Sequence, residues 1–448
     1  MKPFHIEHVS IDELRPPERN ARTHSQKQLH QIAASIREFG FTNPILIDRE
    51  GRVLAGNARL EAAKLLGLFT VPIIRIEHLS SEQKRAYALA DNKIALNSGW
   101  NTDILSVEFK ELAAQDLSFD LEVTGFETAE IDLLIDGPTV DKMDPCDDLP
   151  AIQAEAVTRT GDHWILGEHH LICGDSLRVR TYSELMGRDK ARMVFTDPPY
   201  NVPIDGHVGG LGSIKHREFA MASGEMSELQ FTQFLSTVFA RVASVSEDGA
   251  IHFICMDWRH IGEVLAAGKP VYSELKNVCV WNKDNGGMGS LYRSKHELVF
   301  VFKFGTAAHV NTIELGRSGR YRTNVWDYAW VNTLRAGRQE ALEMHPTVKP
   351  TALVIDAIKD CSQRGDIVLD PFSGSGTTII AAQKSGRRAR AVEIDPLYVD
   401  VAIRRWQKLT GKQAIMDVIG EPFDKIATER SGAVKQTVDS SEMADGRP

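Results

Sequence analysis

The first third of the chain mixes helical and strand-like hydrophobic patterns. Residues 27–40 carry apolar side chains at helical spacing and stop at Gly40, which indicates an amphipathic helix. Short apolar runs at 44–47 and 53–55 predict strands, and a second helical pattern follows over 59–66. We therefore expect a small α+β domain in this part of the chain.

The pattern changes beyond about residue 159. Short apolar runs there are separated by helical stretches, and this alternation is typical of an α/β domain with a largely parallel sheet. The predicted strands are HWILG, HHLICGD, ARMVFTD, AIHFICMD, KNVCVWN, HELVFVFK, DIVLD and RARAVEID.

An acidic, proline-containing segment without periodicity separates the two patterns. A chain of 448 residues also has room for at least two hydrophobic cores. We predict a first domain over 1–136, a linker over 137–158, an α/β domain over 159–415 and a disordered tail over 416–448. The net charge of the whole chain is −9, yet the α/β domain alone is positive, at +4.

Composition narrows the class of protein. No run approaches the roughly eighteen apolar residues of a membrane span, and the first residues lack the apolar core of a signal peptide, so we expect a cytoplasmic protein that does not contact membranes. The five cysteines are scattered without a CxxC pair, which argues against disulfides and a zinc site. We read His169 and His170 as packing or surface residues and predict no metal.

A glycine-rich turn follows one predicted strand, in IVLDPFSGSGTT (367–378). The strand ends at Asp370, and Gly374 and Gly376 let the backbone approach a ligand at the carboxyl end of the sheet, where open α/β sheets bind cofactors. The turn lacks the lysine of a phosphate-binding loop, which argues against an NTPase. Glu393 ends the next strand, where it can accept hydrogen bonds from ribose hydroxyls. Together these features predict a nucleoside cofactor.

The segment TDPPYN (196–201) carries a second kind of chemistry. Two successive prolines hold the chain extended, so that the carboxylate of Asp197 and a neighbouring carbonyl are aimed at a polar guest. Tyr200 offers a stacking face. Two acceptors on an exocyclic amine help its nitrogen attack an electrophilic methyl group, without a metal or a covalent nucleophile. A base in duplex DNA must be flipped out to reach such a site.

In this order, the motifs resemble those of the DNA amino-methyltransferases of the permuted beta class. The resemblance covers about 160–410 and rests on HHLICGDSL, TDPPYN, HPTVKP, DPFSGSGTT and VEIDPLYVDVA. It implies a Rossmann-like domain that uses S-adenosyl-L-methionine and double-stranded DNA, as restriction–modification enzymes do, and that often forms a homodimer. It assigns the target base to Asp197, Pro198, Pro199 and Tyr200. It assigns the cofactor to Asp175, Lys349, Asp370, Phe372, Gly374, Ser375, Gly376, Thr377 and Glu393.

Within this family the aspartate of TDPPY favours adenine-N6, because the cytosine-N4 members more often carry serine there. Cytosine-N4 remains the alternative. A catalytically inactive DNA-binding adaptor is a rival from another class, but the intact TDPPY and DPFSGSG motifs argue against it. A dinucleotide-dependent oxidoreductase would need a GxGxxG turn near the start of the α/β domain, and the sequence has none there.

The first domain resembles the ParB/sulfiredoxin-like superfamily through NPILID, VLAGNARLEAAKLLG and ADNK. In relatives the glycine-arginine box binds a nucleotide or phosphate, which points to Gly56 and Arg59. The sequence reads GNAR where ParB proteins have a doubled arginine, and it lacks the cysteine of sulfiredoxins. The stretch 1–137 has a net charge of −6, so a protein partner for this domain is as good an expectation as a nucleotide.

Two further segments are candidates for DNA contact. Residues 315–338 interleave five arginines with four tyrosine and tryptophan residues, which makes them the candidate target-recognition region, with a solvated loop around core aromatics as the alternative. Residues 205–224 are rich in glycine and carry basic side chains, so they are either a loop that closes over DNA or an ordinary insertion.

Overall fold

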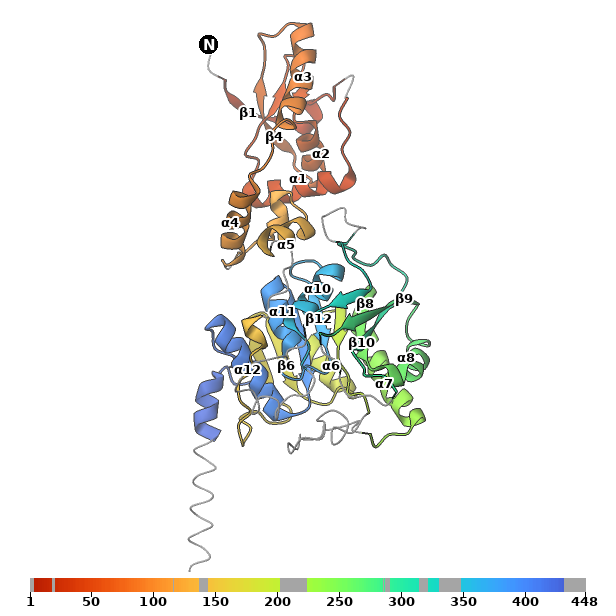
Figure 1. Cartoon of the computed structure of the whole chain (residues 1–448). Helices are drawn as coiled ribbons and strands as arrows, with labels where there is room; N and C mark the ends of the chain where they lie inside the picture. The colour runs from red at the N-terminus through yellow and green to blue at the C-terminus, as the bar shows by residue number, and fades with distance from the viewer. Residues whose placement is uncertain are drawn as a thin grey trace, which may run out of the picture. The chain divides into compact units, whose positions relative to one another are not determined.

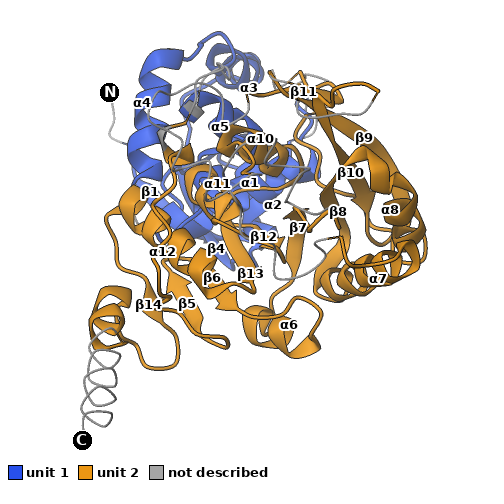
Figure 2. Ribbon diagram, turned by 60° about the horizontal axis from the view of Figure 1, so that its bottom comes forward, with its two compact units in different colours: residues 1–137 blue, residues 138–448 orange. Residues whose placement is uncertain are grey.

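The computed structural model describes residues 4–17, 21–115, 117–136, 144–201, 224–284, 286, 291–313, 321–329 and 348–430. The chain divides into two compact units, residues 1–137 and residues 138–448 (Figure 2). No helix among the described residues is long and apolar enough to cross a membrane.

Unit 1 contains a four-stranded sheet in the order β1-β4-β2-β3, in which β4 pairs antiparallel with β1 and parallel with β2. Buried residues such as Ile45, Leu60 and Ile73 fill the core between this sheet and the helices. Phe109, Leu121 and Ile131 form a separate small core under α4 and α5. Its elements are β1 (Ile6–Ser10), η1 (Ile11–Glu13), α1 (Gln26–Phe39), β2 (Ile45–Ile47), β3 (Val53–Ala55), α2 (Asn57–Leu65), β4 (Thr70–Arg75), α3 (Ser81–Ala95), α4 (Thr102–Ala113), η2 (Leu121–Thr124) and α5 (Thr128–Asp136).

Unit 2 is built on a ten-stranded sheet in the order β11-β9-β10-β8-β7-β12-β13-β6-β5-β14 (Figure 1). Its centre, β8-β7-β12-β13-β6, is parallel throughout, and antiparallel pairs flank it on both sides. The strands are β5 (His163–Leu166), β6 (His169–Cys173), β7 (Ala191–Thr196), β8 (Ser246–Met256), β9 (Glu274–Asn282), β10 (His296–Lys303), β11 (Val325–Asp327), β12 (Ile367–Asp370), β13 (Arg388–Glu393) and β14 (Ile415–Met416).

Helices cover both faces of this sheet. The helical elements are η3 (Pro145–Asp147), α6 (Val179–Met186), α7 (Glu228–Ser244), η4 (Trp258–His260), α8 (Ile261–Gly268), α10 (Thr351–Cys361), α11 (Thr377–Ser385) and α12 (Pro396–Thr410). Successive residues of β8 contact the helix layers on opposite faces of the sheet, because side chains alternate across a strand. Phe253 and Cys255 pack with α10 and α11, whereas Ile254 and Met256 pack with α7 and α8. The predicted Rossmann-like α/β architecture is confirmed, and all eight predicted runs are strands.

The predicted linker and tail differ from the structure. Asp147 is buried and accepts a hydrogen bond from the Thr351 backbone amide at 3.0 Å. The amides of Val157 and Thr158 donate to Asp400 in α12. In the predicted tail, Phe423 and Ile426 are buried in the core beside β5 and α12. The described parts of these segments, 144–158 and 416–430, therefore belong to the fold of unit 2, because short apolar stretches without periodicity still bury side chains against an existing core. Residues 137–143 lie outside the described residues. Residues 431–448 lie outside the described residues.

Candidate active site

The predicted site residues follow neighbouring strands at one edge of the sheet. Asp197 comes directly after β7, Asp370 ends β12, Glu393 ends β13 and Asp175 follows β6. These four strands are adjacent and parallel, so their carboxyl ends meet at the same edge. Ligands of open α/β sheets bind at this edge.

Two buried carboxylates hold the glycine-rich turn. The Asp370 carboxylate accepts hydrogen bonds from the Thr378 hydroxyl at 2.6 Å and from the Phe372 amide at 3.1 Å. Glu393 accepts from the Gly374 amide at 2.7 Å. Burial raises the pKa of both carboxyl groups to about 7, although these donors oppose the shift. Both carboxyl groups therefore titrate close to neutral pH, and pKa values shifted in this way are frequent at functional sites.

Glycine stands at two positions of the turn for different structural reasons. Gly376 has φ +82°, and a Cβ there would lie 2.7 Å from the Ala402 Cβ of α12, so close helix packing requires glycine. Gly374 also has a positive φ, +51°, but a Cβ there would meet no atom within 4 Å. Space at Gly374 is therefore open, as a ligand-binding position needs.

The remaining predicted cofactor residues have partners within the protein. The Ser375 carbonyl and the Thr377 hydroxyl accept from Arg405, at 3.3 and 3.0 Å, so both support the turn. Phe372 packs beside Phe234 of α7, with ring centroids 6.0 Å apart. Asp175 accepts from the Leu177 amide at 2.9 Å and from the Arg178 guanidinium at 3.3 Å.

The predicted catalytic motif, TDPPYN, includes the end of β7 and the start of the loop that follows it. Pro198 is buried and Pro199 half-buried. Asn201, the last residue of the motif, has φ +53° and bonds to the backbone of Gly224 and Met226, where the described chain resumes. This anchor fixes the end of the motif. Residues 202–223, which include nearly all of the predicted mobile loop, lie outside the described residues.

A network of charged groups surrounds Asp197 and Tyr200. The Tyr200 hydroxyl donates to Asp197 Oδ1 at 2.6 Å. Lys349 Nζ lies 2.6 Å from Asp197 Oδ2 and 3.2 Å from the Tyr200 hydroxyl. We predicted Lys349 to lie near the cofactor residues, but its hydrogen-bond and ion-pair partners belong to the catalytic motif and to Glu297. Of the predicted HPTVKP motif, His345, Pro346 and Thr347 lie outside the described residues.

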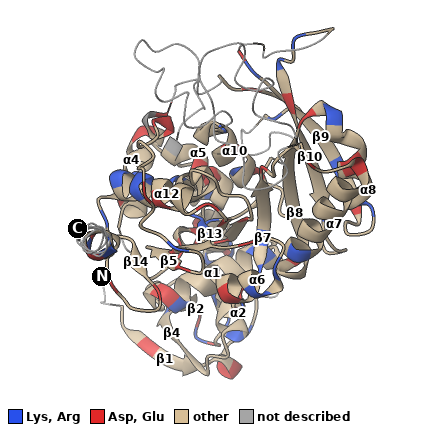
Figure 3. Cartoon of the chain, turned by 90° about the horizontal axis from the view of Figure 1, so that it is seen from below, with Lys and Arg blue, Asp and Glu red and all other residues tan. Residues whose placement is uncertain are grey.

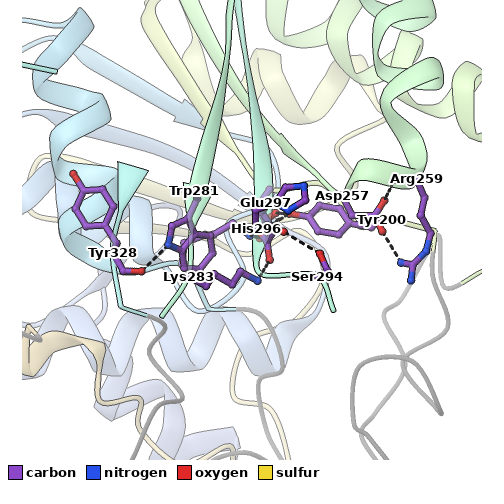
Figure 4. A network of polar contacts seen from close by, with 11 residues as sticks. Tyr200, Asp257, Arg259, Trp281, Lys283, Ser294, His296, Glu297 and Tyr328 are labelled. Atoms are coloured by element: carbon purple, nitrogen blue, oxygen red, sulfur yellow. Dashed lines mark hydrogen bonds and ion pairs between the residues drawn. The ribbon is translucent and has the colours of Figure 1, made fainter. Parts of the chain in front are cut away.

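Glu297 is a member of this network that the sequence patterns missed. It is the second residue of β10, and its Oε2 lies 2.8 Å from Lys349 Nζ and 3.1 Å from the Tyr200 hydroxyl. Its other oxygen pairs with Lys283, which follows β9 (Figure 4). The signal in the sequence was a lone acidic residue at the start of an otherwise apolar strand, HELVFVFK.

Ionisation in the network follows from its pairings. Burial alone would raise the pKa of Glu297, but Lys349 and Lys283 outweigh it and lower that pKa to about 2. Burial and the nearby Glu297 raise the pKa of Asp197, against the lowering effect of Lys349. Glu297 is therefore the more acidic of the two carboxyl groups, and Asp197 is the one whose pKa is raised.

Comparisons with known proteins match family models to both parts of the chain. The DNA methylase family, of the N6/N4 type, matches residues 191–404, which hold both the catalytic motif and the glycine-rich turn. The ParB N-terminal domain family matches residues 2–93, and the helix-turn-helix domain family of ParB-methyltransferases matches residues 103–160. This chain carries a domain of the N6/N4 DNA methylase family behind an N-terminal ParB domain.

Individual relatives resemble the two parts of this methylase separately. The DNA adenine methyltransferase YhdJ of Escherichia coli (strain K12) is 27% identical over 238 residues, which cover 48% of this chain and 75% of the relative. The ParB-like nuclease domain-containing protein YnaK of the same organism is 47% identical over 75 residues, 17% of this chain and 86% of the relative. The solved M1.HpyAVI-SAM complex covers 52% of this chain and 97% of its own, with 20% identity and a TM-score of 0.39.

The described part of the candidate target-recognition region has a structural role in this methylase. Arg322 lies 3.1 Å from Asp360 and 3.4 Å from Asp356 of α10, and it donates to the Tyr328 hydroxyl at 2.8 Å. Trp326 is buried in the core. These three predicted DNA-contacting side chains therefore pack within the protein, as the core-aromatic alternative expected, whereas Tyr321 is 83% exposed. Residues 314–320 and 330–347 lie outside the described residues.

The glycine-arginine box of the ParB domain lies at the start of α2. Gly56 is the N-cap with φ +97°, and a Cβ there would lie 2.8 Å from the Arg59 guanidinium. Within the described chain, Asn57 Oδ1 and Arg59 Nε are buried without a hydrogen-bond partner. Buried polar atoms normally find partners, so these two mark a position where a ligand can supply them.

Proposed function

We propose that this chain transfers a methyl group from S-adenosyl-L-methionine to the N6 amino group of adenine in double-stranded DNA. One observation carries the proposal. Asp197 and Tyr200 of TDPPY stand at the same sheet edge as the glycine-rich turn and Glu393, on adjacent parallel strands. A carboxylate acceptor for an amine and an acidic, glycine-lined cofactor turn are thus neighbours, as one-step transfer requires.

The cofactor is held by the turn and the flanking acids. Glu393 would accept hydrogen bonds from the ribose hydroxyls, and Asp175 would contact the adenine ring. Asp370, Phe372 and the turn from Gly374 to Thr377 would hold the methionine part. When bound, the sulfonium supplies an electrophilic methyl group, so the protein needs no metal and no covalent nucleophile.

The protein acts on the amine. Asp197 and the Pro198 carbonyl accept hydrogen bonds from the two N6 hydrogens, which directs the nitrogen lone pair at the methyl group. Tyr200 stacks on the flipped base. As the nitrogen–carbon bond forms and the carbon–sulfur bond breaks, the nitrogen becomes cationic. Its N–H bond then breaks, and Asp197 accepts the proton. The raised pKa of Asp197, caused by burial, suits this role.

DNA is the partner that the family and the charge favour. The predicted methyltransferase domain, 159–415, is the one positive part of an acidic chain, at +4. Figure 3 marks the Lys and Arg positions in blue and the Asp and Glu positions in red along the described chain. Adenine is favoured over cytosine by the aspartate of TDPPY and by the similarity to the DNA adenine methyltransferase YhdJ.

A direct test incubates the full chain with unmethylated genomic DNA and methyl-labelled S-adenosylmethionine, followed by nuclease digestion and nucleoside mass spectrometry. We expect label in N6-methyladenine for the wild type and for Asp424→Ala, an exposed carboxylate of the same unit, and none for Asp197→Ala. Label in N4-methylcytosine would reassign the base. Cofactor binding without label in any nucleoside would overturn the proposal.

For the ParB domain we propose a nucleotide phosphate as ligand of the Gly56–Arg59 box. The support is the pair of buried, unpartnered atoms on Asn57 and Arg59 within the described residues. Calorimetric titration of the full chain with each of the four ribonucleoside triphosphates should give binding that Arg59→Ala abolishes. Absence of binding for all four would leave a protein partner as the function of this domain.

A further inference from the structure

We propose that Glu297 is a positioning residue of the methyl-transfer site, a second anion that holds Lys349 and Tyr200 so that Asp197 is free to receive the substrate amine. The proposal rests on the function proposed above. Glu297 lies in β10, far in sequence from both motifs. Its proposed role is to accept the hydrogen bonds of Lys349 and Tyr200 when the substrate amine replaces them at Asp197.

The position of Glu297 follows from the sheet. β10 runs antiparallel to β8 and β9, so its first residues lie at the edge where β7 and β8 end. Glu297 pairs with Trp281 in the β9 register, and it is only 8% exposed. Figure 4 shows its carboxylate directed at Tyr200 on one side and at Lys283 on the other. A buried carboxylate costs free energy unless it is paired, so this position needs both lysines.

Lys349 lies between two carboxylates. Its Nζ is 2.6 Å from Asp197 Oδ2 and 2.8 Å from Glu297 Oε2, and the side chain is 5% exposed. An ammonium group has three donors and can serve both acids at once. When the substrate amine approaches Asp197, Lys349 can therefore relinquish that oxygen and keep a compensating charge-assisted bond to Glu297.

Tyr200 is shared in the same way. Its hydroxyl lies 2.6 Å from Asp197 and 3.1 Å from Glu297, yet it has a single hydrogen to donate. Rotation of that hydrogen toward Glu297 vacates a lone pair on Asp197 without leaving the hydroxyl unpaired. Glu297 thus offers an alternative acceptor for each of the two protein donors that occupy Asp197 before substrate binds.

The charges of the network balance. Asp197 and Glu297 are opposed by Lys349 and Lys283, and Lys283 also lies 4.7 Å from the centre of the Trp281 ring. Removal of the Glu297 charge would leave Asp197 as the single carboxylate partner of Lys349, and the ion pair would tighten on the atom that the substrate needs. Removal of Lys283 would instead draw Lys349 toward Glu297.

Removal of the Glu297 charge and removal of the Lys283 charge shift the pKa of Asp197 in opposite directions. The groups that face Asp197 are Tyr200 of its own loop, Lys349 before α10, Glu297 of β10, Cys255 of β8 and Asp370 of β12. Glu297 raises the pKa of Asp197, so its neutralisation lowers that pKa. Loss of the positive Lys283 raises it. Activity requires ionised Asp197 and falls as pH drops through its pKa, so the acid limb of the kcat profile reports the change.

The test measures kcat, the KM for S-adenosylmethionine and the pH profile of DNA methylation by the full chain. For Glu297→Gln we expect kcat to fall at least tenfold with little change in the cofactor KM, and the acid limb to move to lower pH. For Lys283→Met we expect the acid limb to move to higher pH. Glu184→Gln, the same substitution at an exposed position of α6, is the matched control and should behave as the wild type.

Glu297→Asp keeps the charge with a shorter side chain and should restore part of kcat with an acid limb near that of the wild type. If Glu297→Gln does not fold, kcat and the pH profiles of Glu297→Asp and Lys283→Met test the proposal instead. An unchanged kcat and pH profile in Glu297→Gln, or an acid limb that moves to higher pH, would overturn the proposal. Wild-type protein that methylates no DNA would instead overturn the proposed function, so the two failures are distinguishable.

Discussion

Two pairs of carboxylates stand at the same edge of the sheet, and they are stabilised in different ways. Asp197 and Glu297, at the catalytic motif, are paired with the ammonium groups of Lys349 and Lys283. Asp370 and Glu393, at the glycine-rich turn, receive hydrogen bonds from hydroxyl and backbone N–H groups. The first pair is therefore balanced by cationic side chains of the protein, whereas the second pair accepts hydrogen bonds from uncharged donors.

This difference matches what each half of the site receives. The proposed target base, whether adenine or cytosine, is neutral, so the charges of Asp197 and Glu297 must be balanced by the protein itself. S-adenosylmethionine is cationic at its sulfonium and ammonium groups, so acids near it can remain uncompensated until it binds. Burial raises the pKa of Asp370 and Glu393 to about 7, as expected for carboxyl groups without a cationic partner. A nearby cation would lower these pKa values.

The largest expected effect comes from removing the central cation of the first pair. Lys349→Met leaves Asp197 and the buried Glu297 without their shared partner. Loss of one member of a buried ion pair typically costs about 3–5 kcal/mol. We expect the free energy of unfolding to fall by that amount, with the acid limb of kcat displaced to higher pH because Asp197 loses the charge that lowers its pKa.

The double variant Lys349→Met with Glu297→Gln sharpens this prediction. It removes one anion along with the cation, so denaturant unfolding should show that it is more stable than Lys349→Met alone. If the double variant were less stable than the single one, the charges would not be coupled as the distances indicate.

Motif residues and strand patterns were the predictable part of this molecule. The eight apolar runs became strands because alternation depends on local sequence, and Asp197 and Glu393 were found because they end such runs. Glu297 was missed because an acid at the start of an apolar strand resembles a solvent-facing edge residue. The pairing of Arg322 with α10 joins residues 34 and 38 positions apart, which periodicity along the chain cannot reveal.

An intermediate effect is expected at the second pair. Glu393→Gln removes the proposed charged acceptor of the ribose hydroxyls. Hydrogen bonds to charged groups contribute about 1.5–3 kcal/mol, so cofactor affinity should fall on the order of tenfold to a hundredfold. In the wild type, affinity should also decrease as pH drops through about 7, because burial raises the pKa of Glu393 to that value and protonation removes the anionic acceptor.

Calorimetric titration with S-adenosylmethionine between pH 6 and pH 8 measures both effects. Glu393→Gln should lose most of the pH dependence, whereas Asp175→Asn should retain it, since Asp175 is a carboxylate of the same edge. An unaltered pH dependence in Glu393→Gln would assign the titrating group elsewhere, with Asp370 as the remaining candidate, since burial also raises its pKa to about 7.

The smallest effects separate the two glycines of the turn. Both have positive φ, so alanine at either position costs about 1–2 kcal/mol in backbone strain. Gly376→Ala adds a clash, because its Cβ would lie 2.7 Å from the Ala402 Cβ, and it should therefore be the less stable variant by denaturant unfolding. Gly374→Ala meets no protein atom within 4 Å, so its additional cost should appear as weaker cofactor binding. Equal stability of the two variants would mean that α12 moves to accept the methyl group, and undiminished binding by Gly374→Ala would place the cofactor away from that backbone.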